Sequence, residues 1–339
     1  MSKPFARMPL GVELSAGATR LAVASDASPL PAQRAVARFA VPLTPEAAVE
    51  QIVLLLRRAL AAAPDAPEGT LGMVGVALAG SVDAEAGVVR ALPPAPGWAD
   101  FPLATRLGAE LHVPVRVDSD VNAAALAEAK LGAGAAYAHV LYVHLGRTVT
   151  SGYVAHDHLL YGAHGAQGAL GHLAVRAGGP RCACGATGHL DPLASSQAVV
   201  RAMIGRAADR DDSLAAMLRV TSGRAEAITA GQVVTLAVEG DPAAVAVVGE
   251  ALDALALALA AAVALLAPEV IVLAGPLAEA GPAFLDPLAT RLREACDFGS
   301  PAPSPALVRG ALGPRAPLAG ALLLAEVAAG DTPAGTAGA

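Results

Sequence analysis

Short apolar runs that predict strands open the chain, and amphipathic segments that predict helices lie between them. Val, Leu and Ala dominate the strand-like runs in the first third of the chain, at residues 10–14, 21–25, 37–41, 72–78 and 113–117. Thr44 and Pro45 are typical of a helix start, and apolar residues recur on one helical face as far as Leu60. Further helices are predicted over residues 102–111 and 122–130.

The rest of the chain is predicted to be one hairpin followed by mostly helical sequence. Residues 139–145 and 149–154 are expected to pair as the hairpin. Helices are expected at residues 195–207, 230–238, 241–267, 282–296 and 314–328, and strands at residues 270–273 and 306–308. Residues 329–339 contain only Gly, Thr, Pro, Ala and Asp and are expected to be disordered. Strands alternating with helices, some in hairpins, predict an α/β protein with mixed sheets.

The composition favours a soluble cytoplasmic protein with two domains. A length of 339 residues is long for a single core. The longest strongly apolar run, residues 254–267, is shorter than the about 20 residues that a membrane span needs. The net charge of −7 gives no general attraction for nucleic acid, and no basic stripe is present. Three cysteines fit a reducing compartment better than a disulfide framework.

Two cysteines and two histidines are concentrated in the Gly-rich residues 168–191. They are His172, Cys182, Cys184 and His189. Thiolate and imidazole are the ligands that a tetrahedral zinc ion prefers, so these four residues predict a closed structural metal site. The alternative is a Gly-rich surface loop whose cysteines and histidines are unrelated.

Asp120 is the strongest candidate for a catalytic group. It follows the predicted strand 113–117 and directly precedes a predicted helix, at the strand end where open α/β sheets place ligands. A carboxylate there can take a proton from a substrate hydroxyl during phosphoryl transfer. The alternative is a helix cap, since Asp is common before helices.

Two turns contain small residues that a phosphate or a nucleotide base can approach closely. Gly146, Arg147 and Thr148 form the tip of the predicted hairpin, where backbone N–H groups and one guanidinium could bind an anion. Gly275 follows the buried strand 270–273 and could leave room for an adenine ring. An ordinary hairpin turn and an ordinary strand–helix connection explain these two segments equally well.

Taken in order, these segments resemble the ROK family of repressors, open reading frames and sugar kinases, which belongs to the actin-like ATPase superfamily. The resemblance covers about residues 10–328 and is strongest in Asp-Ser-Asp-Val-Asn-Ala-Ala-Ala-Leu-Ala-Glu, residues 118–128. Gly171-His172 followed by the Cys-x-Cys-Gly segment resembles the zinc signature of the family, with His189 in place of its third cysteine. Gly87-Val88-Val89, Pro96-Gly97-Trp98 and residues 268–273 also match.

The resemblance implies two ribonuclease-H-like domains with mixed sheets flanked by helices and a cleft between them. One domain would comprise residues 1–118 with 312–328, and the other residues 119–311 with the zinc loop 168–191. A hexose and ATP with Mg²⁺ would bind in the cleft, and a homodimer is expected. The implied roles are Asp120 as general base, sugar contacts from Gly80, Ser119, His172 and Asp191, and nucleotide contacts from Ser15, Ala16, Gly17, Gly146, Arg147, Thr148 and Gly275.

Several positions depart from the family pattern. The glutamate that binds the sugar in family kinases is Ala169 here, and the asparagine before the catalytic Asp is Ser119. The glutamate after the zinc loop is Asp191, and an asparagine of the Trp98 loop is Pro94. The two phosphate turns read Glu-Leu-Ser-Ala-Gly at residues 13–17 and Gly-Arg-Thr-Val-Thr-Ser-Gly at residues 146–152. Each lost glycine adds a Cβ where backbone must approach phosphate.

These departures leave two hypotheses for the function. The first is an ATP-dependent kinase for glucose or an N-acylhexosamine, with Asp120 as the base. The second is a catalytically inactive relative that senses a sugar or another metabolite, or that acts as a scaffold. A DNA-binding repressor fits least well, because no winged helix precedes the first predicted strand and the charge is negative.

Overall fold

The computed structural model describes residues 8–15, 17–25, 28–38, 43–61, 71–92, 95–165, 167–208, 210–297 and 304–330. The chain divides into two compact units. The first unit contains residues up to Leu131, the segment Leu159–Gln167 and residues from Pro314 onward. The second unit contains Gly132–His158 and Gly168–Gly313. The chain therefore enters and leaves the second unit twice.

The first unit is built on a five-stranded mixed sheet with the strand order β3-β2-β1-β4-β7. The strands are β1 (Met8–Leu14), β2 (Ala18–Ser25), β3 (Ser28–Arg38), β4 (Leu71–Leu78) and β7 (Val115–Ser119). Strand β2 is antiparallel to its neighbours β1 and β3, whereas β4 runs parallel to its neighbours β1 and β7. The carboxyl ends of β1, β4 and β7 therefore meet at one edge of the sheet, where ligands of α/β proteins commonly bind.

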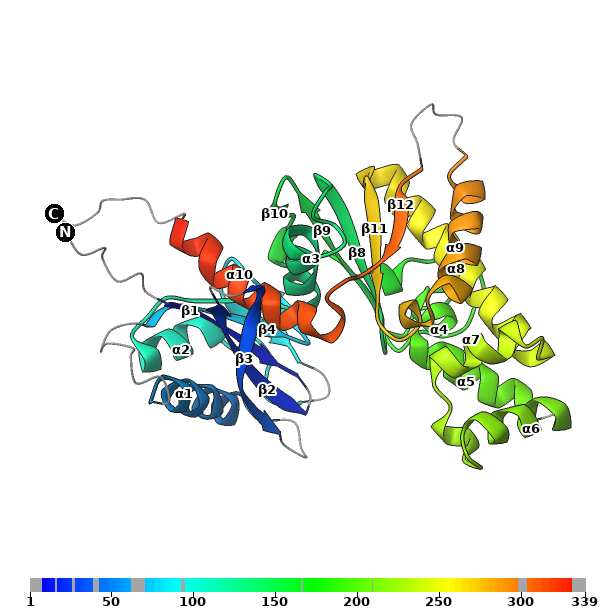
Figure 1. The fold of residues 1–339 in the computed structure, drawn as a ribbon, viewed down its shortest axis with the longest axis horizontal. Coiled ribbons are helices and arrows are strands. Elements are labelled where there is room, and N and C mark those ends of the chain that lie inside the picture. The colour runs from blue at the N-terminus through cyan, green and yellow to red at the C-terminus, as the bar shows by residue number, and fades with distance from the viewer. Residues whose placement is uncertain are drawn as a thin grey trace. The chain divides into compact units, whose positions relative to one another are not determined.

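Helices cover both faces of this sheet (Figure 1). They are α1 (Pro45–Ala61), α2 (Leu103–Leu111), α3 (Asp120–Leu131) and α10 (Ala316–Gly330). Apolar residues of α1 and α2 pack on Leu10, Val12 and their neighbours to form one core. On the other face α3 and α10 pack on a smaller core that includes Ala77.

Helix α10 packs very closely on the sheet because two strand positions facing it are glycines. A Cβ at Gly11 would lie 2.7 Å from the backbone nitrogen of Leu322, and one at Gly75 would lie 1.9 Å from the carbonyl oxygen of Ala321. Strand residues alternate between faces, so the apolar residues beside these glycines point to the α1 side. The chain's last described helix is thus part of the first unit.

The second unit contains another five-stranded sheet, with the order β10-β9-β8-β11-β12. Its strands are β8 (His139–Leu145), β9 (Val149–Ala155), β10 (His158–Leu159), β11 (Val270–Ala274) and β12 (Ala306–Arg309). Strands β8 and β9 form the predicted hairpin, and β11 lies parallel to both β8 and β12.

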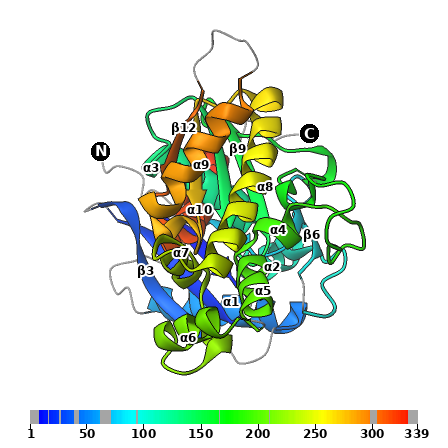
Figure 2. The ribbon, with the colours of Figure 1, turned by 90° about the vertical axis from the view of Figure 1, so that its right-hand side faces the viewer.

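Helices of the second unit pack on one face of its sheet and bury Leu141, Val143 and Ile271. They are α4 (Asp191–Ala194), α5 (Ser196–Ala207), α6 (Asp211–Val220), α7 (Ala230–Val238), α8 (Pro242–Leu266) and α9 (Pro282–Ala295). Figure 2 shows α8 and α9 beside each other. Among the described residues, α8 alone is long and apolar enough to cross a membrane, but 67% of its apolar window is buried in the protein. Such burial is typical of a core helix.

The observed elements differ from the sequence predictions in several places. The third strand is β3, which ends at Arg38, whereas it was expected at residues 37–41. Between the predicted strand 72–78 and the predicted helix 102–111, a short strand, β5 (Ser81–Asp83), pairs with β6 (Val88–Ala91). Helix α6, a short helix that buries only Ser213 and Met217, was not predicted. Helix α3 lies in the first unit with α10, although a domain boundary was expected after Asp118. Residues 331–339 lie outside the described residues.

Candidate functional site

Asp120 lies at the carboxyl edge of the sheet of the first unit, where strand β7 ends and helix α3 begins. The Ser119 hydroxyl accepts a hydrogen bond of 3.2 Å from the backbone N–H of Asn122, so Ser119 caps the helix. Because Ser119 takes the capping position, the carboxylate of Asp120 is not the cap that the alternative interpretation expected. Register pairs Leu78 with both Leu14 and Ser119, which places the ends of three parallel strands side by side.

Burial raises the pKa of the Asp120 carboxyl to about 6, and the negative charge of Glu13 contributes to the rise. Glu13 lies near the end of β1, which β4 separates from β7, and is itself buried, which raises its pKa. Arg20 of β2 forms an ion pair with Glu13 and partly offsets the cost of that burial. A carboxyl with a pKa near 6 is a stronger base than an ordinary aspartate and is still ionised at neutral pH.

A buried hydrogen-bond network holds the residue two positions before Asp120. Asp118 is only 1% exposed. Its Oδ1 accepts hydrogen bonds from the Asn122 side chain at 2.8 Å and from the Ser119 backbone N–H at 2.7 Å. The Tyr161 hydroxyl donates to Oδ2 at 2.6 Å. The sequence did not reveal the role of Tyr161, since it lies in a connecting segment without periodic pattern.

The other expected residues of the first unit lie in turns at the same sheet edge. Ser15 follows β1, and its backbone N–H and its hydroxyl both donate to the Ala18 carbonyl, at 2.9 and 3.0 Å. Gly17 is exposed in this turn, and Ala16 lies outside the described residues. Gly80 follows β4, and a Cβ there would lie 2.4 Å from the Ala91 carbonyl oxygen. Close contact with β6 therefore explains why this position is glycine.

In the second unit, several hydrogen bonds hold the hairpin turn between β8 and β9. Gly146 donates a backbone hydrogen bond of 3.2 Å to the Thr148 carbonyl. The backbone N–H of Val149 donates to Oδ1 of Asp191 at 2.6 Å, and that of Ser151 donates to the Gly168 carbonyl at 2.8 Å. Among the described residues, these bonds leave the amides of Arg147 and Thr148 as the available donors at the exposed tip.

Gly275 lies beside this turn, because it follows β11, the parallel neighbour of β8. Its φ of +93° favours glycine, and a Cβ would lie 2.7 Å from the Leu145 carbonyl oxygen. The structure thus brings Gly275 and the Gly146 turn together at one sheet edge. The imidazole of His144 packs over Gly146, and burial lowers the pKa of that histidine.

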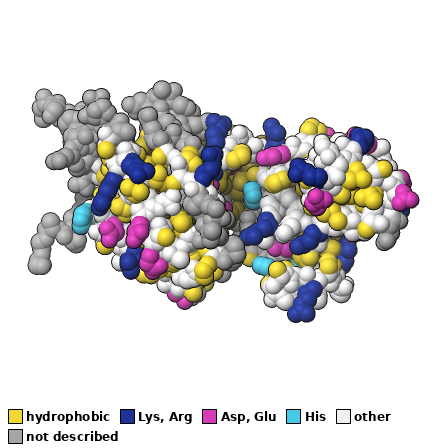
Figure 3. Space-filling view, turned by 90° about the horizontal axis from the view of Figure 1, so that it is seen from below, with side chains coloured by type: hydrophobic (Ala, Val, Ile, Leu, Met, Phe, Trp, Pro, Cys, Tyr) yellow, Lys and Arg dark blue, Asp and Glu magenta, His cyan; other side chains and the backbone are white. Residues whose placement is uncertain are grey.

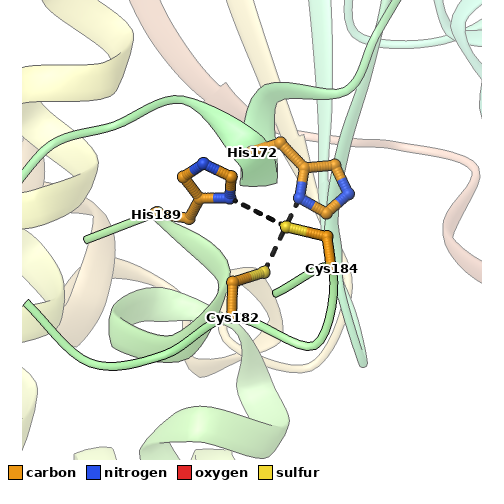
Figure 4. Close-up of side chains that lie close together, drawn as sticks. All are labelled: His172, Cys182, Cys184 and His189. Carbon is orange, nitrogen blue, oxygen red and sulfur yellow. Dashed lines mark hydrogen bonds between the residues drawn. The ribbon is translucent and has the colours of Figure 1, made fainter. Parts of the chain in front are cut away.

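The four metal-ligand candidates converge within the second unit (Figure 4). The ligand atoms of His172, Cys182, Cys184 and His189 all lie within 4.8 Å of one another. Nδ1 of His172 lies 3.6 Å from the Cys182 sulfur, and Nδ1 of His189 lies 3.3 Å from the Cys184 sulfur. Tetrahedral zinc holds its ligand atoms about 3.3–3.8 Å apart. Two thiols and two imidazoles at this spacing therefore fit zinc.

Local backbone structure explains why these four residues meet. Cys182 and Gly185 form a tight turn, in which the Gly185 amide donates to the Cys182 carbonyl at 2.9 Å and φ of Gly185 is +98°. An isolated bridge pairs Ala174 with His189 and brings the two histidine-bearing segments together. Charged side chains of both signs are interspersed over the face of the molecule drawn in Figure 3.

Two mixed sheets flanked by helices, with candidate ligand turns at their strand ends, define an actin-like ATPase fold. The chain belongs to the ROK family, whose sequence profile matches residues 10–328. A glucokinase from Thermotoga maritima is 34% identical over 215 residues, which cover 63% of this chain and 67% of that protein.

Solved structures and repressors are also similar to this chain. A ROK family glucokinase from Streptomyces griseus, in complex with glucose and AMPPNP, aligns with a TM-score of 0.77 and 27% identity. That alignment covers 94% of this chain and 99% of the glucokinase. A putative xylose repressor from Caldicellulosiruptor is 26% identical over 72% of this chain, and the chain spans 59% of its length.

Proposed function

We propose that this protein is an ATP-dependent hexose kinase in which Asp120 is the general base. The observation that carries the proposal is the position of Asp120 at the carboxyl ends of β1, β4 and β7, where burial raises the pKa of its carboxyl. Similarity to glucokinases supports it, and the Streptomyces griseus relative holds glucose and a nucleotide analogue. Cytoplasmic location and a homodimer remain predictions from the sequence.

Asp120 would take the proton of one sugar hydroxyl while that hydroxyl oxygen attacks the terminal phosphorus of ATP. The bond from this phosphorus to the bridging oxygen breaks, and ADP leaves with the electron pair. Mg²⁺ would neutralise the phosphate charges. Ser119 and Gly80 lie at the same sheet edge as Asp120, and we assign them to the sugar side of the site.

Nucleotide contacts are assigned to two sets of turn residues, each described within its own unit. Ser15, Ala16 and Gly17 belong to the first unit, and Gly146, Arg147, Thr148 and Gly275 belong to the second. The amides of Arg147 and Thr148 and the exposed Arg147 guanidinium supply donors and charge for a phosphate. Zinc in the four-ligand site would hold the loop that contains His172, and Asp191 follows this loop.

Turnover is the direct test of the kinase proposal. Purified protein supplied with Mg-ATP and a panel of hexoses and N-acylhexosamines is expected to form sugar phosphate. Asp120→Asn is expected to lower kcat by at least about 100-fold, because a general base contributes that much. Asp286→Asn, in an exposed position of α9, is the matched control. Absence of turnover on every sugar by folded, zinc-loaded protein would contradict the proposal.

A non-catalytic sugar sensor is the second candidate, and the hairpin of the second unit favours it. Thr148, Thr150 and Ser151 have side chains where the phosphate turn of the family has glycines. The backbone N–H groups of Val149 and Ser151 already donate hydrogen bonds within the protein, so they are not available to a phosphate. Xylose repressors are among the relatives. Calorimetry separates the two functions: sugar binding without nucleotide binding supports the sensor. Ala169→Glu, which restores a carboxylate at an exposed position, is expected to tighten sugar binding about tenfold or more.

A further inference from the structure

The Asp191 carboxylate lies between the hairpin turn and the loop that contains the metal-ligand candidates. Its Oδ1 accepts a hydrogen bond of 2.6 Å from the backbone N–H of Val149, the first residue of β9. Hydrogen bonds to a charged acceptor are among the stronger ones in proteins. Asp191 is only two residues beyond His189, so the same short segment carries a metal-ligand candidate and a hairpin contact.

Gly171 closes the other side of this contact. A Cβ at Gly171 would lie 2.2 Å from Oδ1 of Asp191 and 2.6 Å from the Val149 carbonyl oxygen. Gly171 is buried and directly precedes His172, which is another metal-ligand candidate. The backbone at Gly171 therefore covers the Asp191–Val149 hydrogen bond and keeps it from water.

Ser196 adds a second brace next to the first. Its hydroxyl donates to the Leu145 carbonyl at 2.5 Å, and its backbone N–H donates to the Gly146 carbonyl at 2.9 Å. Ser196 begins helix α5, which is capped by Ser195 and packed in the core. The hairpin turn is thus held at three neighbouring points by the chain that follows the metal-ligand loop.

Between Gly171 and Leu190 the loop packs on the core through Val175. Backbone hydrogen bonds of 2.9 Å from Leu190 to the Leu173 carbonyl and from Val175 to the Gly188 carbonyl close it. Cys182 and Gly188 are buried, but most residues between them and His172 are exposed. Leu190, in contrast, is fully buried and fixes the start of α4. Coordination by His172, Cys182, Cys184 and His189 would add to these contacts and fix the backbone beside Gly171, because His172 directly follows Gly171.

We propose that metal binding at these four residues controls the hairpin turn through Gly171 and Asp191, which act as positioning residues. With metal bound, Gly171 shields the Asp191–Val149 hydrogen bond and the Gly146-Arg147-Thr148 tip keeps one conformation. Without metal, the loop leaves Asp191, water reaches the hydrogen bond, and the tip opens. The inference rests on the proposed metal site and does not require the proposed kinase activity.

Hydrogen exchange of the full chain tests this coupling directly. Peptides covering residues 145–151 are followed in zinc-loaded protein and in protein stripped by a chelator. The Val149 amide is expected to exchange about ten- to a hundredfold faster after stripping, the range set by a hydrogen bond to a charged group. In Asp191→Ala the Val149 amide is expected to exchange fast in both the zinc-loaded and the stripped protein. Gly171→Ala displaces Asp191, so its Val149 amide is expected to exchange in the same way.

Three controls separate coupling from general loosening. Asp191→Asn keeps an acceptor oxygen without the charge. The exchange rate of its Val149 amide should therefore fall between the rates in wild type and in Asp191→Ala. Ser196→Ala should speed exchange at the turn and preserve the response to stripping. Asp286→Ala, at an exposed position of α9, should show the same exchange as wild type.

Three results would overturn the inference. One is equal exchange at residues 145–151 in loaded and stripped wild-type protein. Another is wild-type exchange in zinc-loaded Asp191→Ala. A chain that binds no zinc would also overturn it, whereas turnover on hexoses is measured separately and reports on the kinase proposal alone.

Discussion

The Tyr161 hydroxyl donates a hydrogen bond of 2.6 Å to Oδ2 of Asp118, and so joins the segment after β10 to the strand that leads into Asp120. Burial raises the pKa of Asp118, whereas the hydrogen bonds from Tyr161 and Asn122 lower it. The buried carboxylate therefore depends on these donors to remain charged.

Replacement of Tyr161 by Phe is expected to destabilise the protein by about 1–3 kcal/mol, because a buried charged acceptor loses a donor. Urea denaturation at pH 7 measures the loss. Tyr137→Phe removes the hydroxyl of another partly exposed tyrosine and should change stability far less. Equal losses in the two variants would show that the Tyr161–Asp118 hydrogen bond has no special weight.

The pH dependence of turnover should report the pKa of Asp120. Below pH 6 the carboxyl is protonated and cannot accept a proton, so kcat/KM is expected to fall on the acid side with a midpoint at about 6. Glu13→Gln removes a negative charge that raises this pKa, so the midpoint should move to lower pH. Glu110→Gln, at an exposed position of α2, should leave the midpoint unchanged. A midpoint that is unchanged or higher in Glu13→Gln would contradict the assignment.

Metal analysis is expected to find one zinc ion per chain. Cys182→Ser and Cys184→Ser should lose it, because each removes a thiolate of the four-ligand set. Cys296→Ser should retain it, since Cys296 lies outside that set. His189→Cys should also retain zinc, because a thiolate can take the same position.

Thermal denaturation gives a second measurement of the metal site. A site that is filled at about a thousand times its dissociation constant stabilises the folded chain by about 4 kcal/mol. Chelation should therefore lower the Tm of wild type and leave the Tm of Cys184→Ser unchanged. Metal-free wild-type protein with the same Tm would contradict a structural role.

Replacement by Ala is expected to have opposite effects on stability at two helical glycines, one packed against another helix and one in open space. A Cβ at Gly320 would lie 1.8 Å from the Ala123 carbonyl oxygen, so Gly320→Ala should destabilise the first unit by several kcal/mol, about 3 or more. Gly249, in α8, has no atom within 4 Å of the corresponding position. Gly249→Ala should stabilise by about 0.5–1 kcal/mol through helix propensity. Denaturant titrations of both variants measure the difference.

The sequence predicted the ROK family, the mixed α/β fold and the clustering of two cysteines and two histidines, because each depends on local pattern or residue type. The hairpin β8–β9 and the core helix α8 were expected from apolar runs with clear ends. The convergence of His172 with Cys182 was expected from ligand chemistry and is present in the structure. Assignment of zinc, like the catalytic role of Asp120, stays a prediction.

Features that depend on contacts between distant segments were not foreseen. The pairing of Tyr161 with Asp118 spans 43 positions, and no periodicity connects the two residues. Asp191 was expected to bind a sugar hydroxyl, but nothing in its neighbourhood along the chain indicated a hydrogen bond to Val149. Strand β3 was misplaced because polar residues interrupt its pattern, and α6 was missed because it is short and buries only Ser213 and Met217.

The place of α10 in the first unit has a consequence for the order in which the chain folds during synthesis. Domains generally fold as units while the N-terminal part emerges first. Residues 132–313 contain the whole second unit and leave the ribosome before α10, whereas Gly11 and Gly75 must wait for the backbone of α10 to cover them. The sheet edge that carries Asp120 is therefore expected to mature last, after the second unit has already formed.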